Sequence, residues 1–213
     1  MTILTQREQN KLEKRTRIIN AAIRIIHKDG IDALTMRHLA DEAGVSSRTP
    51  YNLFSSKTDI LFAIMMQTTE PLGNLEQDSQ RDLAVAKLFQ RLEALGALDE
   101  EAEPFYRSIH WSIMRSDDLA AKRHAREMLE NVVAGHISTI SELGELKPEC
   151  DFQFLTQHLA ILLAAIVGMW ADSQLTLEQT LDHTREAWIS ALLPQTRGKA
   201  LRYLQNMRQA TAR

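Results

Sequence analysis

The sequence has little of what several folds and sites require. A single cysteine, Cys150, excludes an intramolecular disulfide framework and a cysteine-rich zinc site. Eight glycines and five prolines in 213 residues leave room for few turns, which favours long helices over a β-sandwich. The longest apolar run, residues 159–171, is shorter than the roughly 20 residues of a membrane helix, and the first 15 residues lack a signal peptide's apolar core. We therefore expect a cytoplasmic, all-α protein with no membrane contact.

Charge is distributed unevenly along a chain whose net charge is −3. Residues 1–60 hold ten Lys and Arg against seven Asp and Glu, whereas the remaining residues hold 15 against 21. This asymmetry indicates a basic N-terminal module joined to an acidic body, as in a protein that binds nucleic acid with one part.

Helical periodicity and capping residues divide the chain into elements. Apolar spacing predicts a helix over 14–28 that ends at Gly30 in a left-handed C-cap. Thr35 is the expected N-cap of a second helix, and Ser56 with Asp59 forms a capping-box pattern that opens a helix over 57–69. Further helices, separated by short breaks typical of antiparallel neighbours, are predicted over about 80–96, 100–115, 118–143, 152–171 and 176–193.

The stretch "TMRHLADEAGVSSRTPYNLF", residues 35–54, has the spacing of a helix-turn-helix. Ala40 is small enough for two helices to approach closely, and Gly44 permits the tight turn between them. Val45 and Phe54 would anchor the second helix, although short helices of this kind also occur in ordinary cores. Pro50 falls where that second helix should run, which raises the question of whether it can form.

Residues 14–66, "KRTRIINAAIRIIHKDGIDALTMRHLADEAGVSSRTPYNLFSSKTDILFAIMM", resemble the DNA-binding region of the tetracycline-repressor (TetR) family. The resemblance implies a helix-turn-helix domain over 1–56, a connecting helix over 57–70 and a ligand-binding and dimerisation domain over 71–195. Residues 196–213 would form a basic tail or a short helix. The family usually has Leu where this chain has Pro50. In the first helical turn Pro50 removes at most one hydrogen bond, but it should bias Thr49 away from helical geometry.

The resemblance also implies which residues contact DNA. With Val45, Pro50 and Phe54 turned inward, Arg48 can pair with guanine and Asn52 with adenine or a phosphate. Arg37 would reach a base edge or the backbone, and Thr35, Tyr51 and Lys57 would bind phosphate. The predicted DNA-contacting residues are Thr35, Arg37, Ser47, Arg48, Thr49, Tyr51, Asn52 and Lys57. The alternative is that the three cations are ordinary solvated surface charges.

The remaining helices should hold a ligand pocket and a dimer interface. Bulky apolar side chains with two polar groups among them are the predicted ligand contacts: Phe89, Phe105, Arg107, His110, Trp111, Met114 and Met128. Apolar stripes on the last two long helices form the predicted dimer surface: Leu155, Leu159, Leu162, Ile166, Met169, Leu181, Trp188 and Leu192. Each of these residues also fits an ordinary intramolecular core.

No pattern typical of an enzyme is present. The seven histidines are scattered without a metal-ligand spacing, and no phosphate-binding loop or nucleophile motif occurs. We therefore expect no catalysis, no metal and no cofactor. The resemblance implies a homodimeric repressor that leaves its double-stranded operator when a small, largely apolar ligand binds. An activator remains open, and so does a helical binding dimer whose DNA-binding head is weak or vestigial.

Overall fold

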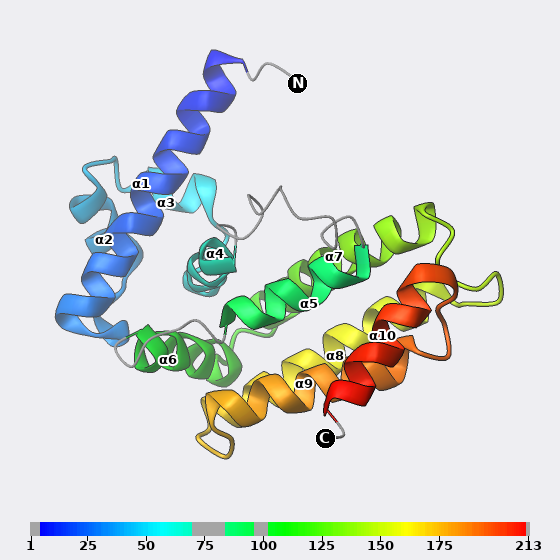
Figure 1. Ribbon diagram of the computed structural model, residues 1–213. Helices are drawn as coiled ribbons and strands as arrows, with labels where there is room; N and C mark the ends of the chain where they lie inside the picture. The colour runs from blue at the N-terminus through cyan, green and yellow to red at the C-terminus, as the bar shows by residue number, and fades with distance from the viewer. Residues whose placement is uncertain (1–4, 70–83, 96–101, 212–213) are drawn as a thin grey trace. The chain divides into compact units, whose positions relative to one another are not determined.

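The computed structural model describes residues 5–69, 84–95 and 102–211. These residues form ten α-helices and one 3₁₀-helix and contain no strand, only an isolated bridge between Leu146 and Thr196 (Figure 1). The elements are α1 (Gln6–Asp29), η1 (Ile31–Ala33), α2 (Met36–Ala43), α3 (Arg48–Leu53), α4 (Lys57–Thr69), α5 (Ala84–Leu95), α6 (Ala102–Arg115), α7 (Leu119–Glu142), α8 (Phe152–Ala171), α9 (Leu177–Leu192) and α10 (Gly198–Thr211). The all-α prediction is confirmed.

The chain divides into two compact units. We call them the head, Met1–Thr68 with Ser112–Ala125, and the body, Thr69–Trp111 with Arg126–Arg213. The head therefore includes the end of α6 and the start of α7, which the sequence had assigned to the ligand-binding domain. The predicted domain boundary after residue 70 falls in 70–83, outside the described residues.

The first helix begins eight residues earlier than the apolar pattern predicted, at Gln6 rather than at 14. Residues 6–13 carry no buried stripe, so the periodicity gave no sign of them. A capping box holds this end, in which Thr5 accepts from the Glu8 backbone and the Glu8 side chain accepts from Thr5. At the other end Gly30 has φ 82° and ψ 166°, so it ends the helix with a positive φ but outside the left-handed helical conformation.

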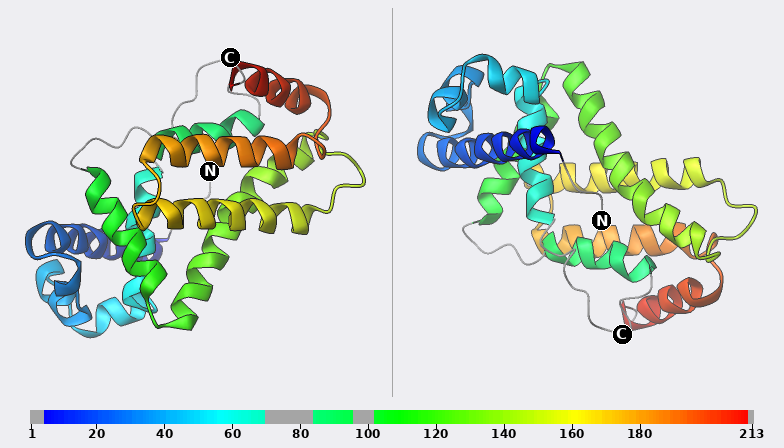
Figure 2. Two further views of the ribbon diagram at one scale, coloured as in Figure 1. Left: turned by 90° about the horizontal axis from the view of Figure 1, so that it is seen from below. Right: turned by 90° about the horizontal axis from the view of Figure 1, so that it is seen from above.

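The body is built around one apolar cluster. Side chains from α5, α7, α8, α9 and α10 meet in it, and α8 and α9 lie side by side in the views of Figures 1 and 2. Of the two forms predicted for the C-terminal segment, a tail or a short helix, the structure has the helix, α10. Ala200 and Leu204 of α10 are fully buried in this cluster. The predicted bounds of α8 and α9 agree with the structure to within one residue at each end.

Helix α8 is apolar well beyond the run noted in the sequence. It has 20 residues, a mean hydropathy of 1.8 over 18 of them, and 39% of that stretch is buried within the chain. Among the described residues it is the one helix long and apolar enough to cross a membrane, and core helices of soluble proteins share these properties. Its unburied apolar side chains need a covering surface.

Candidate functional site

The turn between α2 and α3 has the geometry that the small residues predict. Gly44 is left-handed, with φ 62° and ψ 42°, and Val45 donates its N–H to the Ala40 carbonyl at 3.0 Å. Ala40 itself is fully buried. Thr35 caps α2 as predicted, because its Oγ1 accepts from the backbone of His38. The two short helices therefore meet through a glycine turn, as in a helix-turn-helix.

Pro50 is compatible with α3 because of its position in the helix. It is the third residue after the N-cap Ser47, where the backbone N–H would have no intrahelical partner, so no hydrogen bond is lost. Its ring is buried, and its carbonyl accepts from the Phe54 N–H at 2.8 Å. The expected bias of Thr49 away from helical geometry is wrong. Thr49 is helical, held by a tight 2.8 Å bond from its N–H to the Ser46 carbonyl.

Two arginines of α1 fasten the helix-turn-helix, and sequence reasoning missed both. Arg17 donates from Nη2 to the Ala43 carbonyl at 2.7 Å, at the end of α2. Arg15 donates from Nη1 to the Leu53 carbonyl at 3.0 Å, at the end of α3, and its guanidinium lies 4.3 Å from the centre of the Phe54 ring. Both cations meet the negative ends of helices, which favours the contact. Apolar periodicity carries no signal for such bonds.

Helix α3 presents two flanks to solvent. On one flank Arg37, Ser47, Arg48 and Tyr51 line a surface hollow together with Asp41. On the other flank Thr49 and Asn52 line a second hollow with the start of α1. Tyr51 has 63% of its surface exposed, a high value for an aromatic side chain. Six of the eight predicted DNA-contacting residues thus gather around one protruding helix.

The other two predicted residues lie beside the helix starts. Thr35 uses its hydroxyl oxygen to cap α2, and Lys57 donates from Nζ to the Ile31 carbonyl at 2.7 Å. Partial burial lowers the pKa of Lys57 from its usual value. An ammonium group has three donors, so this bond leaves Lys57 capable of a phosphate contact.

The N-terminus of α4 differs in detail from the predicted capping box. Ser56 accepts from the Asp59 backbone at 3.1 Å as expected, but the Asp59 carboxylate accepts from the Ser55 N–H at 3.0 Å rather than from Ser56. The other carboxylate oxygen lies 3.6 Å from Nε2 of His124 on α7. Asp59 therefore joins α4 to α7 within the head.

The residues predicted to bind a ligand differ in burial, and one of them belongs to the head. Phe89 is fully buried, with its ring centre 6.1 Å from that of Trp188, so it belongs to the body's packed core. Met114 belongs to the head and is 49% exposed. Trp111 is also exposed, while Phe105 and Met128 are partly buried.

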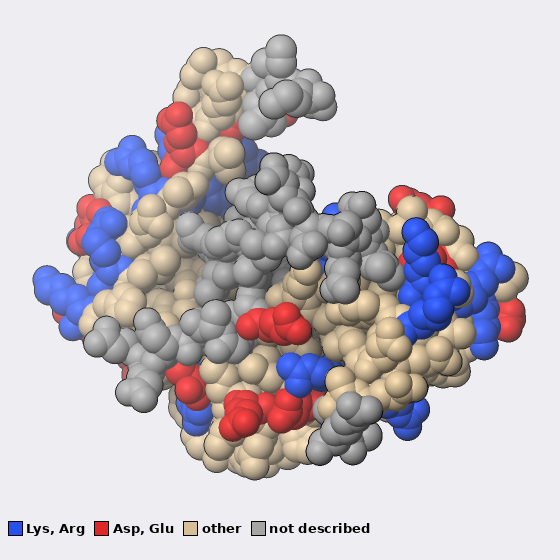
Figure 3. Space-filling view, in the orientation of Figure 1, with Lys and Arg blue, Asp and Glu red and all other residues tan. Residues whose placement is uncertain are grey.

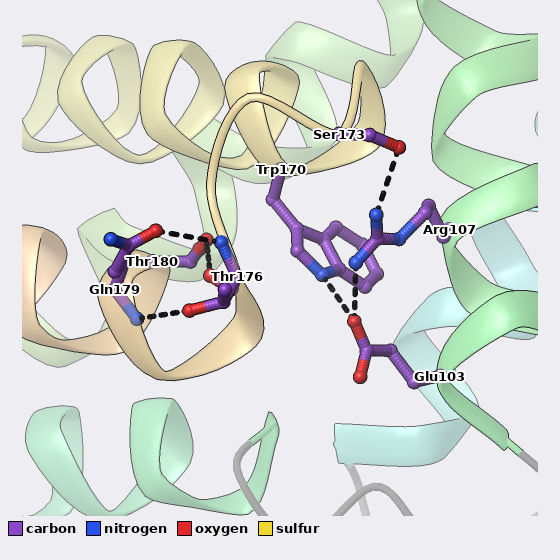
Figure 4. A network of polar contacts seen from close by, with 7 residues as sticks. All are labelled: Glu103, Arg107, Trp170, Ser173, Thr176, Gln179 and Thr180. Carbon is purple, nitrogen blue, oxygen red and sulfur yellow. Dashed lines mark hydrogen bonds and ion pairs between the residues drawn. The ribbon is translucent and has the colours of Figure 1, made fainter. Parts of the chain in front are cut away.

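Glu103 and Arg107 of α6 lie in a polar cluster with Trp170 of α8 and with Ser173, which follows α8 (Figure 4). Arg107 donates to the Ser173 hydroxyl at 2.9 Å and pairs with Glu103, whose carboxylate also accepts from Nε1 of Trp170 at 3.1 Å. The bonds from Arg107 and then Trp170 lower the pKa of Glu103. The His110 ring packs edge-on at 5.6 Å from Trp170, and burial lowers its pKa to about 4. Neutral His110 is therefore the form that this site favours.

Four of the eight residues predicted for the dimer surface are buried within the chain itself. Leu155, Leu159, Trp188 and Leu192 are buried in the body's own core, where Trp188 Nε1 donates to the Leu159 carbonyl at 3.1 Å. Leu162, Ile166 and Leu181 are partly buried, and Met169 is exposed. The stripe that α8 exposes consists instead of residues at helical spacing, Phe154, His158, Ile161, Ala165 and Met169. Sequence reasoning found only one of them.

Comparisons with known proteins agree with this geometry. Residues 18–64 match the sequence model of the bacterial regulatory proteins of the tetR family. The transcriptional regulator UidR of Escherichia coli K12 is 23% identical over 193 residues, covering 84% of this chain and 92% of UidR. Two solved structures have a similar fold, with TM-scores of 0.60 for the first and 0.61 for the second of those named next. Thermus thermophilus FadR is 20% identical over 84% of this chain and 95% of its own, and the Streptomyces fradiae regulator TylP is 16% identical over 92% and 84%.

The matched segment contains the glycine turn, the buried Pro50 and the exposed face of α3. The relatives that align with 83% and 84% of this chain are named transcriptional regulators. Residues 18–64 are therefore those of a TetR-family DNA-binding region, and the comparisons together support a TetR-family transcriptional regulator.

Proposed function

We propose that this chain is a homodimeric, cytoplasmic repressor that binds a palindromic operator and leaves it when a small, largely apolar ligand binds the body. The observation that carries the proposal is the exposed face of α3, with Arg48, Tyr51 and Asn52 outward while Pro50 and Phe54 are buried. A short helix held in this way can enter the major groove, where an arginine fork pairs with guanine.

The dimer is supported by the exposed stripe of α8. Phe154 is 65% exposed, Ile161 55% and Met169 42%, although all three are large apolar side chains. They recur at helical spacing, with His158 and Ala165 between them, so they lie on one face of the helix. A second copy of the chain would cover it, and two heads would then read two half-sites about 34–36 Å apart.

Ligand release requires a difference in affinity between two arrangements of the dimer. Helices α6 and α7 each contribute residues to both units, and α4 carries Asp59, which contacts His124 of α7. We expect these helices to carry the change from the body to the head. The solved structure of FadR is a complex with lauroyl-CoA, and an acyl chain is one example of the apolar ligand class.

The proposal is tested by fluorescence anisotropy with a labelled duplex from the region upstream of the protein's own gene. Arg48→Ala should weaken binding by about 1–3 kcal/mol and relax the preference for one base pair. Lys147→Ala, an exchange of a cation in the body's α7–α8 loop, is the control and should leave affinity unchanged.

If the upstream duplex does not bind, a selection from random duplexes follows. Failure of both experiments with a folded, dimeric protein would refute the DNA-binding proposal and favour the binding dimer with a vestigial head. Binding that Arg48→Ala leaves unaltered would show that α3 is not the reading helix.

A further inference from the structure

The first turns of α1, Gln6–Lys14, lie outside the segment that matches the family, and all but Lys14 lie outside the helix predicted from apolar spacing. All nine side chains of this stretch, which we call the α1 arm, are exposed. A helix that buries nothing gains no stability from packing, so its capping box at Thr5 and Glu8 is its local support. An ordered helix without a buried face calls for a functional explanation.

The charges of the α1 arm are sorted by face. Arg7, Lys11 and Lys14 recur at i, i+4 and i+7, which places them on one side of the helix. They line a surface hollow of about 600 Å³ together with Gln6, Asn10 and three residues of α3, Thr49, Asn52 and Leu53.

The two carboxylates of the arm, Glu8 and Glu13, are not among the residues that line this hollow. Glu8 is engaged at the cap, where it accepts from the Thr5 N–H at 2.8 Å and from the Thr5 hydroxyl at 2.7 Å. Figure 3 shows cationic and acidic side chains mixed over one face of the molecule. The separation of charge concerns only the residues that line the hollow. That lining carries three positive charges and no negative one.

The position of the α1 arm relative to α3 is fixed by hydrogen bonds. Arg15 follows directly after the arm and binds the Leu53 carbonyl at 3.0 Å, and Arg17 binds the Ala43 carbonyl at 2.7 Å. Lys14 and Lys11 lie within about one helical turn of Arg15 and Arg7 lies about two turns away, so the helix carries all three cations beside α3. The three cations are therefore held beside α3 before any partner binds. This preorganisation reduces the conformational entropy that the protein loses on binding.

We propose that the α1 arm is a second DNA-contacting element, in which Arg7, Lys11 and Lys14 bind phosphates of one strand while the α2 flank of α3 faces the other strand. The inference rests on the proposed DNA-binding function. The two hollows lie on opposite flanks of α3, one holding Arg37 and Arg48 and the other holding the arm cations. A helix in the major groove has a phosphate backbone on each side, so both flanks meet phosphate.

The test is the salt dependence of DNA binding by the full-length protein, measured by anisotropy from 50 to 200 mM salt. The variant combines Arg7→Gln, Lys11→Gln and Lys14→Gln. Each lost phosphate contact should flatten the slope of log K against log salt by about 0.9, or roughly 2.7 for three contacts in each bound subunit. The loss of affinity per subunit should then be about 40-fold larger at 50 mM than at 200 mM salt. Because phosphates carry no sequence information, the operator and a random duplex should lose affinity by similar factors.

A matched control removes three exposed cations from α10, Lys199→Gln, Arg202→Gln and Arg208→Gln, and gives the same net charge. It should keep the wild-type slope. Equal slopes for the wild type and the arm variant, with Arg48→Ala still weakening binding, would overturn the role of the arm and leave the proposed function standing. Equal flattening in the arm and α10 variants would also overturn it, because net charge alone would explain the result. If the wild type binds no duplex, the proposed function and this inference fail together.

Discussion

Ile161→Asp should dissociate the proposed dimer without unfolding the subunit. Ile161 lies at the centre of the exposed α8 stripe, with Phe154 seven residues before it and Met169 eight residues after it. Its side chain is 55% exposed in the single chain, so the subunit's own core depends little on it. In a dimer built on this stripe, the same residue of each subunit would be covered by the partner.

The magnitude follows from the exposed fraction. Full burial of an isoleucine side chain contributes about 1.5–3 kcal/mol, so covering the exposed half contributes roughly 0.8–1.5 kcal/mol. Because the residue occurs twice in a symmetric dimer, the loss is about 1.6–3 kcal/mol, or roughly 15- to 150-fold in the dissociation constant. A buried aspartate adds its own desolvation cost, so these values are a lower bound.

The dissociation constant is measured by sedimentation velocity over a dilution series, with circular dichroism as the check on folding. Leu12→Asp is a matched control, because Leu12 is 56% exposed but lies on α1 in the head. It should leave the dissociation constant unchanged. A wild type that is monomeric throughout, or an Ile161→Asp variant that dimerises like the wild type, would show that the α8 stripe is not the interface.

Two further predictions concern stability. Gly44→Ala should destabilise the head by about 1–2 kcal/mol, because Gly44 has φ 62° and the added Cβ would lie 3.3 Å from Nη2 of Arg17. Gly135→Ala, the same exchange inside α7 with open space around it, should stabilise by up to about 1 kcal/mol, and thermal unfolding that ranks the two alike would contradict the argument. His110 should make the protein less stable as pH falls from about 6.5 to about 4, because its folded pKa of about 4 lies below its unfolded value, so the unfolded state binds the proton first. The loss should reach about 2–3 kcal/mol in urea titrations, and a His110→Phe variant with the same pH dependence in this range would refute it.

The sequence was most informative where a helix buries one stripe and ends at a polar cap. The helix predicted over 176–193 is α9, Leu177–Leu192, in which Thr180, Thr184, Trp188 and Leu192 form one buried stripe after the N-cap Thr176. The turn at Gly44 is similarly readable, since few residues other than glycine adopt its backbone conformation. Pro50 was correctly expected to be tolerated, but its effect on Thr49 was overestimated because the bond to Ser46 could not be foreseen.

The sequence was least informative where a helix lacks a one-sided pattern. The α1 arm has no apolar stripe, so nothing in its periodicity marked it as helical. The hydrogen bonds from Arg15 and Arg17 join residues 38 and 26 positions apart in the sequence. The spacing of residues within one helix cannot predict such bonds.

By itself the sequence determined the all-α class, the family of the N-terminal segment and the residues around the reading helix, since each depends on local spacing. Only the tertiary structure decided which side of α8 faces inward. That helix is apolar on nearly every side, so Leu155 and Ile161 are equivalent by composition. Packing against α9, with Trp188 bonded to the Leu159 carbonyl, buries one stripe and leaves the other exposed. Burial is a property of the neighbouring helix, and a residue's own sequence context does not contain it.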